Sequence, residues 1–345
     1  MSRRATYRLD STLRLDQVQV LGSHNSYHGR PYTQVLAALR KSSPALEESL
    51  DYAHAPLLQQ FDIGVRQIEL DVYADPQGGR YARPSFPISL GVRAPDDPVM
   101  HEPGFKIIHQ ADVDTNSTCL TFVRCLDLVK KWSDAHPGHV PLDVHVEMKD
   151  PTVNESTFAA LEREIKGVFP PRQIITPDFV RGDAATLGAA VRAHGWPTLG
   201  RVRGKVYFTL DNEAFRSAYL VGHPSLRGRL LFTPSRPGAD DAAFAKLNDP
   251  VADAAAIRAA LAAHMIVRTR ADADTFQARS NNTTTRETAL AGGAQLVSTD
   301  YERPDPTLHT GYVVRIPGGT PARCDPVTAP PTCRPTDVEN PALLR

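Results

Sequence analysis

The chain has 345 residues, of which 41% are hydrophobic, so it can bury a substantial core as one large domain or two ordinary ones. Lysine plus arginine and aspartate plus glutamate each number 39, and the zero net charge argues against a nucleic-acid-binding protein and against a polybasic membrane anchor. No run of about 18 uncharged apolar residues predicts a transmembrane helix.

Two strands and two helices are predicted at the start of the chain. The strands cover residues 17–21 and 64–73, and helical patterns cover residues 33–40 and 45–62. Gly22 breaks the first strand and leaves His24 and Asn25 just beyond its end. In the second strand, alternation of side chains places Glu69 and Asp71 together on the face opposite an apolar one. Two carboxylates on such a strand are costly to bury unless they are ion-paired, hydrogen-bonded or metal-bound.

Residues 74–104 contain six prolines and show neither helical nor strand periodicity. A loop this long in a compact domain is usually functional or disordered, so we interpret it as a lid or rim over a site. Its apolar residues are candidates for contact with a membrane, although a loop packed on the barrel is an equal alternative. These residues are Tyr81, Phe86, Ile88 and Leu90.

Residues 105–109 predict a short strand that ends at His109, and residues 120–135 predict an amphipathic helix. The strand over residues 141–149 alternates between an apolar face and a face of polar side chains. The polar face carries Asp143, His145, Glu147 and Lys149. Such polarity is unusual inside a sandwich but suits the upper layers of a barrel, where we expect His145 to be structural.

The remaining chain alternates between helical and strand patterns. Helices are predicted over 158–168, 252–264 and 285–291, and strands over 205–211, 229–233, 265–270 and 295–301. About eight strands, most of them separated by helices, predict an α/β fold with a single (β/α)8 TIM-type barrel, irregular in places. The alternative is a doubly wound sheet, which usually has a glycine-rich turn after its first strand, and none is present. We expect the barrel to occupy residues 1–315 and a proline-rich, irregular tail to occupy residues 316–345.

The four cysteines form two close pairs, Cys119 with Cys125 and Cys324 with Cys333. Neither pair has the short spacing of a zinc site, and no histidine pair accompanies them. Two local disulfides fit better and favour a secreted, mature protein. The alternatives are the two non-local pairings, four unpaired thiols and a cytosolic location. The amino terminus lacks an apolar signal core.

The active site of a barrel lies at the carboxyl ends of its strands, so the residues there are expected to meet. They are His24, Asn25, Glu69, Asp71, His109, Glu147, Lys149, Asp211, Arg268, Arg270 and Tyr301. Three carboxylates and an amide oxygen suit Ca2+, with Mg2+ less favoured, far better than zinc. Two histidines beside such an ion suit acid–base chemistry on a phosphate ester, and the cations would neutralise phosphate charge. Taken singly, the carboxylates could be an ion-paired surface and His109 a core histidine.

This order of strand-end motifs resembles the phosphatidylinositol-specific phospholipase C-like phosphodiesterase superfamily. His24-Asn25 is similar to the pattern of calcium-dependent, eukaryote-like phospholipases C, and the segment from Trp132 to Pro141 resembles their bacterial branch. Ile107-Ile-His-Gln-Ala-Asp-Val-Asp and Val146-Glu-Met-Lys also resemble motifs of glycerophosphodiester phosphodiesterases. The resemblance is strongest over residues 17–150 and does not cover the tail.

The resemblance implies that Ca2+ is held by Asn25, Glu69, Asp71 and Glu147. It also implies that His24 and His109 act as the acid–base or transition-state-stabilising pair, and that Lys149 contacts the phosphate. Asp211, Arg268, Arg270 and Tyr301 are substrate-binding candidates from their positions alone.

The first functional hypothesis is a calcium-dependent phospholipase C that cleaves phosphatidylinositol at a membrane surface through a cyclic inositol phosphate. The alternatives are a glycerophosphodiester phosphodiesterase acting on another headgroup and a non-catalytic barrel that binds a headgroup. We expect a monomer that touches the membrane only transiently and has no nucleic-acid partner.

Overall fold

The computed structural model describes residues 7–344. Eight parallel strands form a barrel in the order β6, β5, β4, β2, β1, β9, β8, β7. They are β1 (Val18–Ser23), β2 (Val65–Tyr73), β4 (Leu142–Met148), β5 (Val206–Leu210), β6 (Leu231–Phe232), β7 (Phe244–Lys246), β8 (Ile266–Arg270) and β9 (Leu296–Thr299). Between β6 and β7, the described part of the chain shows one bridge, Pro234 with Phe244, so the barrel is nearly closed with an irregular seam. The predicted α/β barrel is confirmed.

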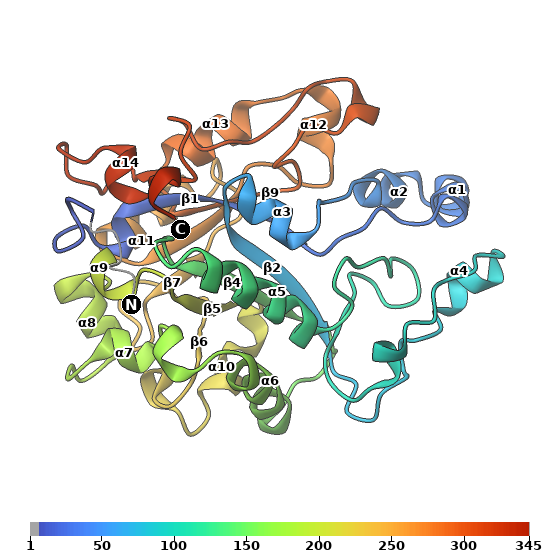
Figure 1. Cartoon of the computed structure of the whole chain (residues 1–345), viewed down its shortest axis with the longest axis horizontal. Helices are drawn as coiled ribbons and strands as arrows, with labels where there is room; N and C mark the ends of the chain where they lie inside the picture. The colour runs from blue at the N-terminus through green and yellow to red at the C-terminus, as the bar shows by residue number, and fades with distance from the viewer. Residues whose placement is uncertain (1–6, 345) are drawn as a thin grey trace.

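Helices surround the barrel (Figure 1). The main ones are α1 (Thr33–Ser42), α2 (Pro44–Leu50), α3 (Leu57–Asp62), α5 (Phe122–Ala135), α6 (Glu155–Val168), α7 (Pro177–Arg181), α8 (Leu187–His194), α9 (Leu199–Val202), α10 (Arg216–Leu220), α11 (Ala254–Ala262), α12 (Phe276–Ser280) and α13 (Thr284–Ala291). Helix α5 shows why they form: Thr121 caps its first turn, and Phe122, Leu126 and Val129 recur at helical spacing on its buried face. Every helix among the described residues is too short or too polar to span a bilayer.

Strand β2 lies next to β1 and β4 and alternates as predicted. Ile68 and Leu70 are fully buried on its apolar face. Glu69 is in register with His145 of β4, so polar side chains from neighbouring strands share the barrel interior. Gly22 of β1 makes room for this layer, because a Cβ atom there would lie 1.8 Å from the Gln67 side-chain oxygen.

The predicted strand over residues 105–109 is not a barrel strand. Only β3 (Lys106–Ile107) forms, and it pairs antiparallel with the end of β2. The missing barrel strand is β7, which is three residues long and therefore too short to show a period of two. The predicted helix over residues 45–62 is also wrong as one element. It divides into α2 and α3, because Pro56 disfavours helical backbone in the residue before it.

The long loop over residues 74–104 contains a short helix, α4 (Ser85–Ser89), and a 3-10 turn, η2 (Pro98–His101). Phe86 and Leu90 pack against Val35 of α1, so much of the loop rests on the segment after β1. Figure 1 shows α1, α2 and α4 projecting together at one end of the molecule. Ile88 stays 40% exposed at this end, whereas Tyr81, Phe86 and Leu90 are partly buried.

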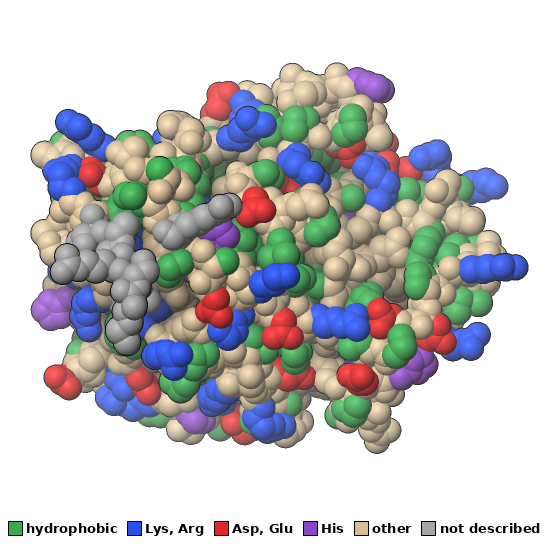
Figure 2. Space-filling view, viewed as in Figure 1, with side chains coloured by type: hydrophobic (Ala, Val, Ile, Leu, Met, Phe, Trp, Pro, Cys, Tyr) green, Lys and Arg blue, Asp and Glu red, His purple; other side chains and the backbone are tan. Residues whose placement is uncertain are grey.

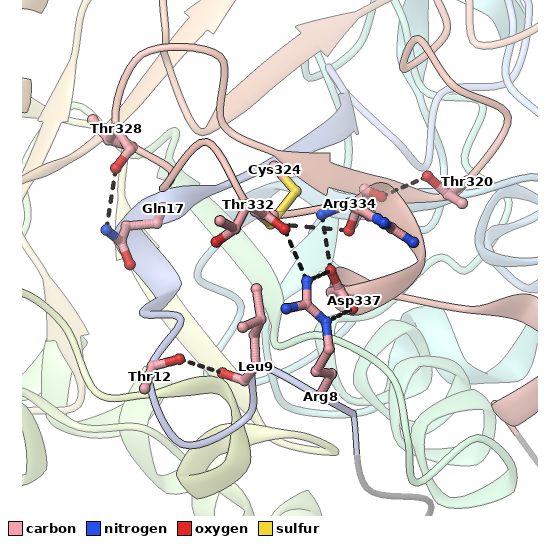
Figure 3. Close-up of a disulfide and its surroundings, with 12 residues drawn as sticks. Arg8, Leu9, Thr12, Gln17, Thr320, Cys324, Thr328, Thr332, Arg334 and Asp337 are labelled. Atoms are coloured by element: carbon pink, nitrogen blue, oxygen red, sulfur yellow. Dashed lines mark hydrogen bonds and ion pairs between the residues drawn. A yellow bond between two sulfur atoms is a disulfide. The ribbon is translucent and has the colours of Figure 1, made fainter.

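Both predicted disulfides form, Cys119 with Cys125 and Cys324 with Cys333. The second lies in the tail, where β10 (Ala322–Cys324) pairs antiparallel with β1. Arg8 donates to both carboxylate oxygens of Asp337 in α14 (Pro335–Val338) and to the carbonyl of Thr332 (Figure 3). The tail is therefore fastened to the beginning of the chain, and the division at residue 315 stays a prediction.

Acidic and basic side chains are interspersed over the face shown in Figure 2, in keeping with the zero net charge. The view shows no broad single-sign patch of the kind that attracts nucleic acid.

Candidate active site

Three carboxylates meet at the mouth of the barrel. Glu69 and Asp71 come from β2 and Glu147 from β4, and one oxygen of each lies within 4.8 Å of the other two. The register explains the convergence, because Asp71 is directly opposite Glu147 and side chains two residues apart share a face. Asp71 is fully buried and Glu69 is 2% exposed, so this concentration of negative charge needs compensation.

Asn25 lies beside these carboxylates. Its neighbour Ser26 bonds with the backbone of Glu69 in both directions, at 3.0 Å and 2.8 Å. The Asn25 backbone has φ +47°, and its side-chain nitrogen donates to the Tyr52 hydroxyl at 3.1 Å. This bond orients the amide and leaves Oδ1 of Asn25 buried without a hydrogen-bond partner. The oxygens of Asp71 also accept no hydrogen bond, although one of them is ion-paired with Lys149.

A buried oxygen without a partner is costly, so several of them converging on one place suit a cation. Carboxylate and amide oxygens are the ligands that Ca2+ prefers, and sulfur and imidazole ligands are not needed. The side chains of Asn25, Glu69, Asp71 and Glu147 therefore fit a hard divalent cation.

Two cations of the chain lie against the carboxylates. Nζ of Lys149 is 3.1 Å from Asp71 and 3.2 Å from Glu147, and Arg268 is 2.5 Å from Glu69. Burial and the neighbouring Glu147 raise the pKa of Asp71 to about 8. The charges of Lys149 and Arg268 therefore do not fully compensate the three carboxylates. Burial opposes the charge on Lys149, but Asp71 and Glu147 outweigh it and hold the pKa of Lys149 above its usual value.

His24 follows β1 and is held from behind by a carboxylate. Its Nδ1 donates to Asp300 at 2.7 Å, which turns Nε2 toward Glu69, 3.9 Å away. Arg270 contacts both partners, at 3.3 Å from His24 Nε2 and 2.9 Å from Asp300. Burial and then the charge of Arg270 lower the pKa of His24, so its imidazole is neutral with Nε2 as an acceptor.

His109 has a similar support. Its Nδ1 donates to Asp114 at 2.7 Å, and the same Asp114 oxygen lies 2.6 Å from Nε2 of His28. His28 is fully buried and stacks on Tyr52 with 4.3 Å between ring centroids. Burial lowers the pKa of His109, but the hydrogen bond to Asp114 and the charge of Asp71 outweigh it and raise the pKa above its usual value.

The other predicted substrate-binding residues are placed differently from one another. Arg270 reaches His24 at the mouth, whereas Arg268 lies deeper against Glu69. Asp211 is also in the interior, 3.0 Å from His145 and 2.7 Å from Lys246. Tyr301 makes no side-chain hydrogen bond to this group among the described residues, and it lines a cleft on the flank of the barrel that Asp300 also borders.

The sequence interpretation missed Asp300, Asp114 and His28. Asp300 directly follows β9 and so lies at a strand end, which was a usable signal. Asp114 and His28 are on loops, and their meeting depends on how those loops cross.

A family model described as Ca2+-dependent phosphoinositide phospholipase C matches residues 13–326. The chain belongs to this family. As a member of this family, the protein is a phosphoric diester hydrolase with calcium as its cofactor. The match also supports phosphoinositide phospholipase C activity in general.

Solved structures of family members share the fold of this phospholipase. One is a calcium-dependent phosphoinositol-specific phospholipase C from the Gram-negative bacterium Pseudomonas sp., with TM-score 0.58 and 16% identity over 92% of this chain and 98% of that chain. Another is a Ca2+-dependent phosphatidylinositol-specific phospholipase C from Streptomyces antibioticus, with TM-score 0.54 and 17% identity over 87% of this chain and 97% of that chain. No curated protein matches the chain by sequence.

Proposed function

We propose that this phospholipase cleaves phosphatidylinositol to diacylglycerol and a cyclic inositol phosphate, with Asn25, Glu69, Asp71 and Glu147 holding Ca2+. The observation that carries the proposal is a cluster of carboxylate and amide oxygens, of which those of Asn25 and Asp71 accept no hydrogen bond, beside two carboxylate-supported imidazoles at one barrel mouth. A structural metal site would not need both imidazoles. When bound, calcium supplies electrostatic stabilisation of the phosphate and lowers the pKa of a nearby hydroxyl.

His24 is suited to accept the proton of the attacking inositol hydroxyl. Its neutral form presents the Nε2 lone pair, because Nδ1 is committed to Asp300. Asp300 holds the ring in this orientation and stabilises the positive charge that develops on proton transfer.

His109 is suited to the opposite task, protonation of the leaving diacylglycerol oxygen. Asp114 fixes its Nδ1 proton, which leaves the Nε2 proton of the charged ring to donate. The hydrogen bond to Asp114 and the charge of Asp71 raise the pKa of His109, which favours the protonated ring that this task needs.

Arg270 and Lys149 are the cations we assign to the phosphate. Arg270 lies beside His24, so an oxygen of a phosphate attacked there would be within reach of its guanidinium. Lys149 contacts Asp71 and Glu147, and its Nζ would be free to contact the phosphate if these carboxylates held a cation instead. Arg268 and Asp211 act through other residues, by fixing Glu69 and His145 in the barrel interior.

The two disulfides support a secreted protein, because such bonds persist in oxidising compartments. Ile88 on the loop after β2 is the exposed apolar residue that would meet a lipid surface during turnover.

The direct test is release of diacylglycerol from phosphatidylinositol vesicles in calcium and in excess EGTA. We expect release only with calcium, and near-complete loss in His24→Ala and in Glu147→Gln. His309→Ala is the matched control, because this exposed histidine lies on a surface turn, and we expect full activity. Hydrolysis of glycerophosphoinositol without hydrolysis of phosphatidylinositol would contradict the proposal and favour a glycerophosphodiesterase.

A further inference from the structure

The segment over residues 51–56, which joins α2 to α3, contacts both residues that follow β1. The Tyr52 hydroxyl bonds the side chain of Asn25, and Nε2 of His54 lies 2.7 Å from the carbonyl oxygen of His24. We call this stretch the α2–α3 segment. It borders a proposed calcium ligand and the proposed base without supplying either of them.

The α2–α3 segment is itself fixed on both sides of Tyr52. Asp51 pairs with Arg30, and Nδ1 of His54 lies 2.8 Å from Glu302. Tyr52 is only 2% exposed. A side chain can orient a neighbour only when its own position is fixed, and these contacts meet that condition for Tyr52.

The hydroxyl of Tyr52 determines which end of the Asn25 amide is left for a cation. It accepts a hydrogen bond from Nδ2 at 3.1 Å, while Oδ1 of Asn25 is buried and accepts none. The two ends of an amide are not equivalent, because the oxygen can bind a cation and the NH2 group cannot. Without the hydroxyl, Nδ2 would lose its acceptor, and an unsatisfied buried donor is costly. The hydroxyl therefore favours the orientation that leaves Oδ1 available.

The ring of Tyr52 makes a different contact. It stacks on the imidazole of His28, with 4.3 Å between ring centroids and 18° between ring planes. His28 is fully buried, and its Nε2 lies 2.6 Å from the Asp114 oxygen that also bonds His109. A close-packed aromatic neighbour restricts the rotation of an imidazole. The stack therefore keeps His28 directed at Asp114, behind His109.

We propose that Tyr52 is a positioning residue with two separate tasks. Its hydroxyl holds the Asn25 amide with Oδ1 available for calcium, and its ring holds His28 behind the pair of Asp114 and His109. The inference rests on the proposed function, because it takes Asn25 as a calcium ligand and His109 as the acid. Loss of the hydroxyl should affect calcium binding, and loss of the ring should also affect protonation of the leaving group.

Tyr52→Phe removes the hydroxyl and keeps the ring. We expect its calcium affinity, measured by calorimetry without substrate, to fall by about tenfold or more, because the group that orients a metal ligand is lost. The matched control is Tyr219→Phe in α10, since Tyr219 is also buried and its hydroxyl bonds Glu162 at 2.6 Å. The control should bind calcium as tightly as the parent protein, and circular dichroism should show both variants folded. Unchanged affinity in Tyr52→Phe, or an equal loss in Tyr219→Phe, would overturn the task of the hydroxyl.

Asn25→Gly separates this inference from the proposed function. Glycine adopts the φ of +47° at this position without strain, so the substitution removes the amide and spares the backbone. We expect weaker calcium binding, and no further loss when Tyr52→Phe is added, because the hydroxyl acts through the amide. A further loss in the double variant would contradict that route.

Two other outcomes distinguish the failures. Unchanged calcium affinity in Asn25→Gly would remove Asn25 from the proposed ligand set, and the task of the hydroxyl with it. Weak binding in Asn25→Gly beside full affinity in Tyr52→Phe would leave the ligand set intact and overturn only the task of the hydroxyl.

Tyr52→Leu removes the ring as well. At saturating calcium, we expect kcat on phosphatidylinositol to fall by about tenfold relative to Tyr52→Phe. With an inositol phosphate ester of an acidic phenol, whose leaving group needs no proton, the two variants should have similar rates. His28→Asn, which leaves Tyr52 in place, should lose activity on phosphatidylinositol and recover it on the phenol ester in the same way. Equal losses on the two substrates in both variants would show that the ring does not act through His109.

Discussion

His24 and His109 are built alike but face different charges. Each imidazole donates through Nδ1 to a carboxylate at 2.7 Å. Nε2 of His24 contacts the guanidinium of Arg270, whereas the charge that acts on His109 is the carboxylate of Asp71. The pKa of His24 is accordingly lowered by burial and Arg270, and the pKa of His109 is raised in spite of burial. Two similar dyads can thus become a base and an acid through their neighbours alone.

The largest effect should come from removing each imidazole while changing the leaving group. His24→Ala and His109→Ala should each lose about a hundredfold to ten-thousandfold of kcat on phosphatidylinositol. With an inositol phosphate ester of an acidic phenol, which leaves without protonation, His109→Ala should recover much of the loss and His24→Ala should not. Chromogenic release of the phenol measures both. Equal recovery in the two variants would contradict the assignment of His24 as base and His109 as acid, and recovery in His24→Ala alone would reverse it.

Removing the carboxylate behind His109 should shift the pH dependence of the reaction. Asp114→Asn removes the negative charge from the group that accepts the His109 Nδ1 proton, so the pKa of His109 falls and its proton is lost at lower pH. We expect kcat to fall by roughly tenfold to a hundredfold, with the alkaline limb of the profile moved to lower pH.

The matched change on the other side is Arg270→Gln. Loss of the guanidinium raises the pKa of His24, so the acidic limb of the kcat/KM profile should move to higher pH. If both variants shifted the same limb of the pH profile, His24 and His109 would not have opposite roles.

Calcium affinity should rise with pH, by up to about tenfold per pH unit below pH 8. The pKa of Asp71 is raised to about 8 by burial and Glu147, so a proton competes with the metal at lower pH. The stability of the metal-free protein should change in the opposite direction. Asp71 keeps a proton in the folded state that it has lost in the unfolded chain, so the free energy of unfolding falls as pH rises through about 8. Calorimetry and thermal unfolding measure the two effects. A calcium affinity independent of pH between 6 and 9 would remove Asp71 from the ligand set.

The smallest effect should follow loss of the disulfide near His109. Cys119→Ser with Cys125→Ser removes a disulfide with a sequence separation of 6. A disulfide that closes so short a loop stabilises the fold by about 2 kcal/mol. Denaturant unfolding should show this loss with less than tenfold change in kcat. Unchanged stability would mean that the loop is ordered without the bond.

Periodicity was sufficient to predict the barrel, because β2 and β4 are long enough to show alternation. The ends of parallel strands then lie at the same end of the barrel. The same logic predicted that Glu69, Asp71 and Glu147 would meet, and the structure brings them together. Spacing favoured the two local disulfides that form, but it left the two non-local pairings of the four cysteines open.

Features that depend on chain crossings were not predictable. Strand β7 is too short to show a period, and β3 has a strand-like composition but runs antiparallel to β2. Tyr301 was expected at the mouth from its position after β9, and the structure places its side chain on the wall of a flank cleft that Asp300 also borders. The supports of His109 come from two loops that meet only in the folded chain.

The central claim is that this barrel mouth, loaded with calcium, transfers the phosphate of phosphatidylinositol to a neighbouring inositol hydroxyl. Phosphorus NMR of a phosphatidylinositol digest, followed over time with calcium and with EGTA, tests it most directly. The account predicts a cyclic inositol phosphate signal that appears first and only with calcium. The same signal in EGTA, or an acyclic phosphate as the first product, would contradict it.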